Sequence, residues 1–220
     1  MKKLLLVLLF FPLVSFGQNI SKLEELNGFR ELKLGSDIRE YNFVEKANPQ
    51  NTSYYYTRFG FKSVDFQERT RDYRDTKLFV IKKGTPNYQF MPAGDKIEKV
   101  FIDTFENKIF SIKIVVHHRG ASDYFLLKSY RDVFGKPNFI DGLITNFSEG
   151  VSKSNSYTDY WSGKNISLTI MAINGSKNFS GTKRRFYWVI YDELGEINQI
   201  LTERKKKRES IKKQKLIDNF

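Results

Sequence analysis

Residues 99–116 read KVFIDTFENKIFSIKIVV, and this stretch decides the fold. Apolar residues alternate with others on both sides of its centre, which is the period of a strand with one buried face. The segment Glu106-Asn107-Lys108 lies between the two alternating runs, and asparagine tolerates the left-handed backbone that turns require. A three-residue loop there predicts a β-hairpin in which Ile102 lies opposite Ile112, with the apolar side chains on one face.

The chain after the hairpin predicts one helix and three more strands. Ser122 is a helix N-cap, and Gly135 with Pro137 ends the helix. Its apolar stripe consists of Leu126, Leu127, Tyr130, Val133 and Phe134. A polar loop then runs to about residue 155, and strands follow over residues 157–161, 166–173 and 185–191. Hairpin, helix and three strands indicate an α+β fold, an antiparallel sheet with a helix on one face.

The residues before the hairpin predict a smaller strand-helix unit. Residues 29–34 read as a brief strand, and Ser36 caps a helix in which Ile38, Tyr41 and Val44 recur at helical spacing. Further strands are expected over residues 54–61 and 76–82. The Gly/Pro loop ending at residue 94 divides an N-terminal portion, 18–94, from a main portion, 95–196. The N-terminal portion either extends the same sheet or forms a small second lobe.

The first seventeen residues predict a cleavable secretory signal peptide. Lys2 and Lys3 precede an apolar run over residues 4–16, and Ser15 and Gly17 are small residues at the −3 and −1 positions of the cut. The apolar run of about thirteen residues is shorter than the ~20 residues that a helix needs to span a bilayer, so we do not expect it to anchor the chain in a membrane. No transmembrane span is expected after its cleavage. The chain has no cysteine, which excludes disulfides and cysteine-linked lipid. We expect an exported protein, periplasmic or secreted.

The C-terminal residues 197–220 predict a strongly basic helix or tail. The full chain carries a net charge of +12, and residues 203–220 hold eight Lys or Arg against three Asp or Glu. The densest run is Arg204, Lys205, Lys206, Lys207 and Arg208. Outside the cytoplasm such a run fits an envelope protein or an anionic surface of lipid headgroups or polysaccharide, and nucleic acid is not expected. The alternative is a solvated tail that keeps the protein soluble.

A second candidate binding surface is the aromatic run at residues 54–56. Tyr54 and Tyr56 point the same way on a strand, and Arg58 lies close by. Exposed rings beside an arginine stack on sugars or peptides. The alternative is that the rings pack in the core with their hydroxyl groups at its rim.

Catalytic, cofactor and metal sites find little support in the sequence. His117 and His118 are adjacent, so on a strand they point to opposite faces and do not chelate one ion. No phosphate loop or nucleophile elbow is present. Four carboxylates could serve glycoside hydrolysis, although interleaved arginines favour an ion-paired surface: Asp65, Glu68, Asp72 and Asp75.

Three short motifs resemble those of small exported bacterial proteins without an assigned function. They are G-F-R-E-L-K-L-G-S at residues 28–36, F-G-K-P at 134–137 and Y-W-S-G-K at 160–164. The resemblance implies an exported protein. Because the motifs are helix ends and turns, it assigns no catalytic residue in this chain.

Together these features predict an exported, non-catalytic binding or envelope-accessory module without a cofactor. The alternative is a small secreted hydrolase that acts on glycans through carboxylates. Export, the basic C-terminal run and the lack of a convergent catalytic set favour the binding module.

Overall fold

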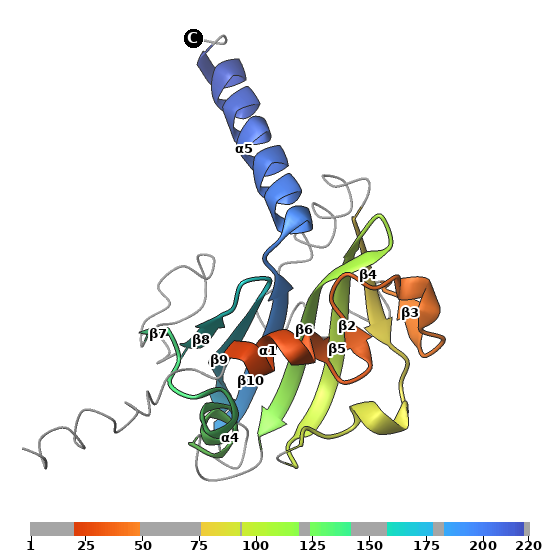
Figure 1. The fold of residues 1–220 in the computed structure, drawn as a ribbon, viewed down its shortest axis with the longest axis vertical. Helices are drawn as coiled ribbons and strands as arrows, with labels where there is room; N and C mark the ends of the chain where they lie inside the picture. Colours follow the sequence, from red (N-terminus) through yellow and green to blue (C-terminus); the bar gives the residue numbers. More distant parts are fainter. Residues whose placement is uncertain are drawn as a thin grey trace, which may run out of the picture.

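The computed structural model describes residues 20–48, 76–92, 94–118, 124–141, 158–177 and 183–217. Within these ranges the chain is an α+β protein built on one large antiparallel sheet (Figure 1). The sheet has eight strands in the order β3-β4-β5-β6-β10-β9-β8-β7. Their bounds are β3 Val44–Lys46, β4 Thr76–Ile81, β5 Lys96–Phe105, β6 Lys108–His118, β7 Phe139–Asp141, β8 Thr158–Ser162, β9 Ile166–Lys177 and β10 Lys183–Glu193.

The hairpin β5–β6 near the middle of the sheet confirms the prediction made from residues 99–116. Ile102 lies directly opposite Ile112, and both side chains are fully buried. The turn is one residue tighter than expected, because Lys108 already belongs to β6. Glu106 and Asn107 form it with φ angles of 49° and 67°. Positive φ at both central residues matches the twist of the paired strands.

The late strands also confirm the sequence pattern, with one addition. β8, β9 and β10 cover the three strands predicted after the helix, and β10 pairs with both β6 and β9. The long β10 thereby joins the first hairpin to the second. The addition is β7, which lies where a polar loop was predicted and pairs at the edge with β8.

The N-terminal portion shares the large sheet. β4 pairs with β5, and β3 pairs with β4, so two strands from this portion extend the sheet beyond the hairpin. β4 precedes the Gly/Pro loop and β5 follows it, so the strands on both sides of this loop belong to one sheet. The strand expected over residues 54–61 lies outside the described residues.

Two predictions for the N-terminal portion are wrong. Residues 29–34 do not form one strand, because β1 (Gly28–Phe29) and β2 (Leu32–Lys33) pair with each other around a turn at Arg30. The helix after Ser36 is only one 3-10 turn, η2 (Ile38–Glu40), and the chain reaches β3 four residues later. Asp37 is its N-cap instead of Ser36, since its side chain accepts a hydrogen bond from the backbone N–H of Arg39. The pairing of β3 with β4 at the sheet edge places Val44 in a strand, although Ile38, Tyr41 and Val44 have helical spacing in the sequence.

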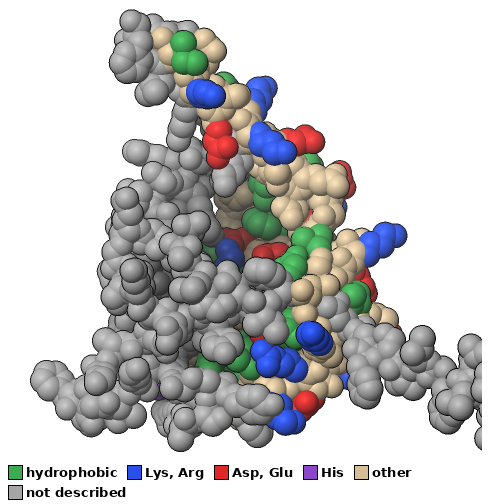
Figure 2. All heavy atoms as spheres, turned by 90° about the vertical axis from the view of Figure 1, so that its left-hand side faces the viewer, with side chains coloured by type: hydrophobic (Ala, Val, Ile, Leu, Met, Phe, Trp, Pro, Cys, Tyr) green, Lys and Arg blue, Asp and Glu red, His purple; other side chains and the backbone are tan. Residues whose placement is uncertain are grey.

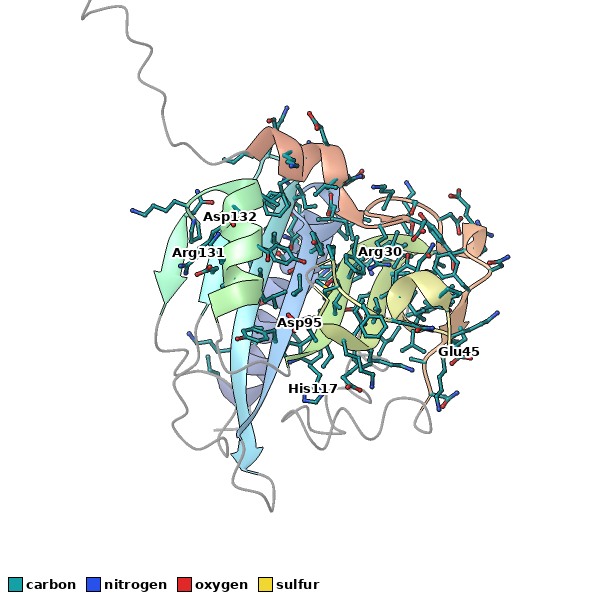
Figure 3. All side chains as sticks on the ribbon, turned by 90° about the horizontal axis from the view of Figure 1, so that it is seen from below. Arg30, Glu45, Asp95, His117, Arg131 and Asp132 are labelled. Atoms are coloured by element: carbon teal, nitrogen blue, oxygen red, sulfur yellow. The ribbon has the colours of Figure 1, made fainter. Side chains whose placement is uncertain are left out.

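One face of the sheet is covered by α1 (Ile20–Leu26), α4 (Tyr124–Phe134) and the β1–β2 hairpin (Figures 1 and 3). The predicted stripe of α4 faces the sheet, with Leu126, Leu127 and Phe134 buried. Gly135 ends the helix as expected: its φ is 75°, and its N–H donates to the Arg131 carbonyl at 2.8 Å.

The two faces of the sheet carry separate hydrophobic clusters. The larger lies under the helices and includes Leu23, Leu126 and Tyr187 with the inward side chains of the strands. The smaller lies on the opposite face around Phe101, Val115 and Trp188. The central strands are therefore apolar on both sides, which explains the continuous hydrophobic runs in β6 and β10.

Candidate functional site

The last helix, α5 (Glu196–Ile217), starts immediately after β10 and is fixed at its base by backbone and side-chain hydrogen bonds. The Leu194 N–H donates to the Asn165 carbonyl at 2.8 Å, which holds the end of β10 against the β8–β9 turn. The Glu193 carboxylate accepts a hydrogen bond of 3.2 Å from the backbone N–H of Asn198 in the first turn of the helix. A negative charge at this end complements the helix dipole.

Side-chain packing also secures the lower turns of α5. Ile197 is buried, and Ile200 and Leu201 are half-buried. The guanidinium of Arg204 lies over the ring of Phe105, 5.0 Å from its centroid, at the end of β5. Such cation–π contacts contribute about 0.5–1 kcal/mol near a surface. These contacts hold the first turns of α5 against the folded body.

Beyond Arg204 the helix projects away from the sheet as a stalk (Figure 1). The thirteen residues from Lys205 to Ile217 span about 20 Å at 1.5 Å per residue. Lys206, Lys207 and Lys213 are exposed along this part. The arrangement holds a dense positive charge clear of the folded body.

The positive charge surrounds the stalk. Successive helical residues advance by about 100°, so the helix positions of Lys205, Lys206, Lys207 and Arg208 are spread around the axis of the stalk. Figure 2 shows basic side chains on more than one side of the helix. The two exposed isoleucines, Ile211 and Ile217, are 46% and 57% exposed, and their spacing sets them about 120° apart around the axis. Among the side chains of the stalk that the structure describes, the apolar ones therefore form no single stripe that would bury itself in a flat surface.

A second group of polar and aromatic residues lies on the helix-covered face, around the β1–β2 turn. Arg30 has a φ of 56° there, and its guanidinium lies 5.3 Å from the Phe29 ring centroid and 5.7 Å from that of Tyr88. Tyr88 belongs to η3 (Pro86–Tyr88), and its hydroxyl donates to Glu31 Oε2 at 2.9 Å. Burial and this hydrogen bond raise the pKa of Tyr88, whereas hydrogen bonds from its own backbone, Tyr88 and Asn87 lower the pKa of Glu31.

The sequence singled out the basic run but missed the Arg30 group. Arg204, Lys205, Lys206, Lys207 and Arg208 all belong to α5, as expected. Nothing in the sequence marks Arg30, because its neighbours in space, Tyr88 and Phe90, are about sixty residues away. Two other groups of candidates lie outside the described residues: the aromatic run with Tyr54, Tyr56 and Arg58, and the carboxylates Asp65, Glu68, Asp72 and Asp75.

The two histidines occupy the end of β6. His117 Nδ1 lies 3.3 Å from Glu98 Oε1, which pairs the imidazole with a carboxylate of β5. His118 follows directly on the same strand. In the described part of the chain, no three His, Cys, Asp or Glu side chains come together as ligands for a metal ion.

Comparisons with known proteins add no assignment. No protein-family model matches this chain, and neither the curated proteins nor the solved structures contain a match. Among the described helices, none is both long enough and apolar enough to cross a membrane.

Proposed function

We propose that the protein is a non-catalytic binding protein of the cell envelope that captures acidic polysaccharide with α5. The observation that carries the proposal is the stalk itself, a helix with positive charge on all sides that projects about 20 Å from its anchored base (Figure 1). The leader expected at residues 1–17 supports the proposal, because export would bring the mature chain to acidic polysaccharides outside the cytoplasm.

The distribution of charge favours a flexible polyanion over a flat surface. A helix that binds a bilayer in its plane buries an apolar face and keeps its basic residues at the interface. On α5 the exposed isoleucines Ile211 and Ile217 lie on different sides, so one face cannot bury both. A flexible chain of acidic sugars can follow the helix around its circumference and meet basic residues on every side.

The anchored base supports binding by removing part of its entropic cost. Glu193 and Phe105 fix the first turns of α5, so the charges of the stalk are presented by a helix that is already formed. A basic tail that folded only on contact would lose conformational freedom at that moment. The preformed helix retains more of the electrostatic attraction as affinity.

The test is binding of the full chain to polygalacturonate, with uncharged dextran as the neutral polymer. The variant K205Q/K206Q/K207Q/R208Q removes four positive charges from α5 and keeps Arg204 on Phe105. The matched control K83Q/K108Q/K136Q/K164Q removes four exposed lysine charges from the body. We expect the α5 variant to bind at least tenfold more weakly and the body variant to bind within about threefold of the unmodified chain.

Other outcomes would overturn the proposal. Equal losses with both variants would make binding a matter of total charge. Binding to anionic phosphatidylglycerol vesicles or to polyglutamate, but not to polygalacturonate, would assign α5 to lipid headgroups or to an acidic protein. Release of new reducing ends from polygalacturonate would make the protein an enzyme.

A further inference from the structure

Arg30 has a backbone conformation that is unfavourable for arginine. It lies between β1 and β2 with a φ of 56°, in the left-handed region that glycine and asparagine adopt most easily. Residues held in such conformations persist where the surrounding structure fixes them, and they cluster at binding and catalytic sites. The contacts of its side chain explain why an arginine occupies this position.

The guanidinium of Arg30 is held in place before any ligand arrives. It lies over the rings of Phe29 and Tyr88, and one of its nitrogens, Nη2, donates to the backbone carbonyl of Phe90. The two rings pack edge to face with centroids 5.9 Å apart. Figure 3 shows Arg30 on the helix-covered side of the sheet, in line with its contacts to the β1–β2 turn and η3. A long side chain that is already ordered loses less entropy on binding.

Arg30 lies near the Glu31 carboxylate, whose pKa its charge lowers, but within the described ranges it forms no ion pair. Arg39 and Arg131 each pair with an aspartate, whereas Arg30 makes no ion pair with any residue that the structure describes. The nearest carboxylate in sequence, Glu31, instead accepts hydrogen bonds of 2.9 Å from Asn87 Nδ2 and from the Tyr88 hydroxyl. Most of the N–H donors of Arg30 thus remain available to a ligand.

The residue whose backbone carbonyl accepts the hydrogen bond from Arg30 carries an exposed aromatic side chain. This residue, Phe90, is 53% exposed. The exposed polar side chains of Asn87 and Gln89 come from the same short segment. A ring, a fixed guanidinium and amide groups are the elements that bind a polar ring with an acid group attached.

We propose that Arg30 and Phe90 form a binding site for a single uronate sugar. The planar guanidinium donates two parallel hydrogen bonds to the sugar carboxylate, and the Phe90 ring stacks on the apolar face of the sugar. The choice of a sugar acid among carboxylates rests on the function proposed above. The site itself does not, because it lies on the helix-covered face of the sheet and contains no residue of α5.

The test is an NMR titration of the 15N-labelled full chain with the monosaccharide galacturonate. We expect saturable shifts of the Arg30 side-chain Nε–H and of backbone amides in the β1–β2 turn and η3. Galactose lacks the acid and should cause no such shifts, and acetate lacks the ring and should bind at least tenfold more weakly. Equal shifts with galactose, equal affinity for acetate, or shifts confined to α5 would overturn the proposal.

Arg30→Asn separates binding from folding. Asparagine accepts the left-handed backbone, and this gain offsets the lost contacts of the Arg30 side chain with Tyr88 and Phe90, so we expect a melting temperature within about 3 °C of the unmodified chain together with loss of galacturonate shifts. Arg30→Lys keeps the charge but not the fork, and Phe90→Ala removes an exposed ring; each should weaken binding several-fold. Arg39→Asn is the matched control and should bind normally. Normal affinity in Arg30→Asn would contradict the site.

The variant K205Q/K206Q/K207Q/R208Q distinguishes the two proposals. It should keep full affinity for the monosaccharide while it loses affinity for the polymer. Loss of both affinities would assign the monosaccharide to α5 and overturn the Arg30 site. If this variant binds the polymer as tightly as the unmodified chain, the role proposed for the stalk is overturned and the Arg30 site is not affected.

Discussion

At Gly28 the backbone leaves no space for a side chain. Its φ is 140°, and a Cβ built there would lie 2.2 Å from the Leu32 carbonyl oxygen. We expect Gly28→Ala to lower the free energy of unfolding by about 2–4 kcal/mol, because the β1–β2 hairpin must open to admit the methyl group. Urea unfolding followed by tryptophan fluorescence measures the change.

Gly84→Ala is the matched control for this prediction. Gly84 also has a positive φ, 87°, but a Cβ there meets nothing within 4 Å. Only the backbone cost of about 1 kcal/mol is expected. Equal losses of stability in the two variants would show that the approach to Leu32 does not matter.

Tyr130 and Tyr191 make the fold sensitive to alkali. Their hydroxyl groups lie 3.4 Å apart, and burial raises the pKa of Tyr130 and raises that of Tyr191 from 10.0 to about 12. The folded state therefore favours the neutral phenol more than the unfolded state does. The stability that this contributes is complete below pH 10 and is lost as the pH rises from 10 towards 12.

Tyr191→Phe removes one of these ionisable groups. We expect the urea midpoint of the unmodified chain to fall more steeply between pH 10 and 12 than that of the variant, because the phenylalanine ring does not ionise. Identical slopes in the two proteins would contradict the burial of a neutral phenol at this position.

At the scale of elements, a buried ion pair joins α4 to the sheet. Arg131 donates through Nε to Asp159 Oδ2 at 2.7 Å and through Nη2 to Oδ1 at 2.8 Å, and Asp159 in β8 is fully buried. Asparagine at position 159 keeps one acceptor oxygen instead of two, so one of the two hydrogen bonds from Arg131 is lost at a position that is fully buried. We expect Asp159→Asn to cost about 3 kcal/mol of unfolding free energy, measured by urea denaturation.

The neighbouring Asp132 supplies the control for Asp159. It pairs with Lys128 on the exposed side of α4 at 2.6 Å, and Figure 3 labels it beside Arg131. Asp132→Asn removes the same charge from the same helix region and should cost less than about 0.5 kcal/mol. A cost for Asp159→Asn as small as this would mean that water reaches the pair.

The elements that the sequence predicts well are those whose pattern agrees with their packing. In β5 and β6 the apolar residues alternate because one side faces the larger cluster, and Asn107 marks the turn. In α4 the stripe, the closing Gly135 and Pro137 all indicate the same helix. Local preference and tertiary packing point to one structure in these segments.

The N-terminal elements escape prediction because distant contacts decide them. Arg30 and Glu31 form a turn without the Gly or Asn that marks most hairpins, so residues 29–34 resemble a strand. The turn is stabilised instead by Tyr88 and Phe90, which no local pattern connects to it. Likewise Val44 leaves the helical spacing because it pairs with Ile81 of β4.

For the molecule as a whole, the basic run was visible in the sequence, but its geometry was not. The charges of residues 204–208 predict attraction to anions wherever the chain goes. Their projection from the body depends on Glu193, on Phe105 and on the end of β10, which come together only in the folded sheet. The orientation of the Arg30 guanidinium could be predicted even less, since it depends on contacts with Tyr88 and Phe90, about sixty residues away.

The salt dependence of polygalacturonate binding tests whether α5 is the element that binds the polymer. Counterions released by the basic residues make the logarithm of the affinity fall linearly with the logarithm of salt concentration, with a slope that grows with the number of charges neutralised. We expect a steep slope for the unmodified chain and for K83Q/K108Q/K136Q/K164Q, and a clearly shallower slope for K205Q/K206Q/K207Q/R208Q. Equal slopes for all three proteins would contradict the assignment of binding to α5.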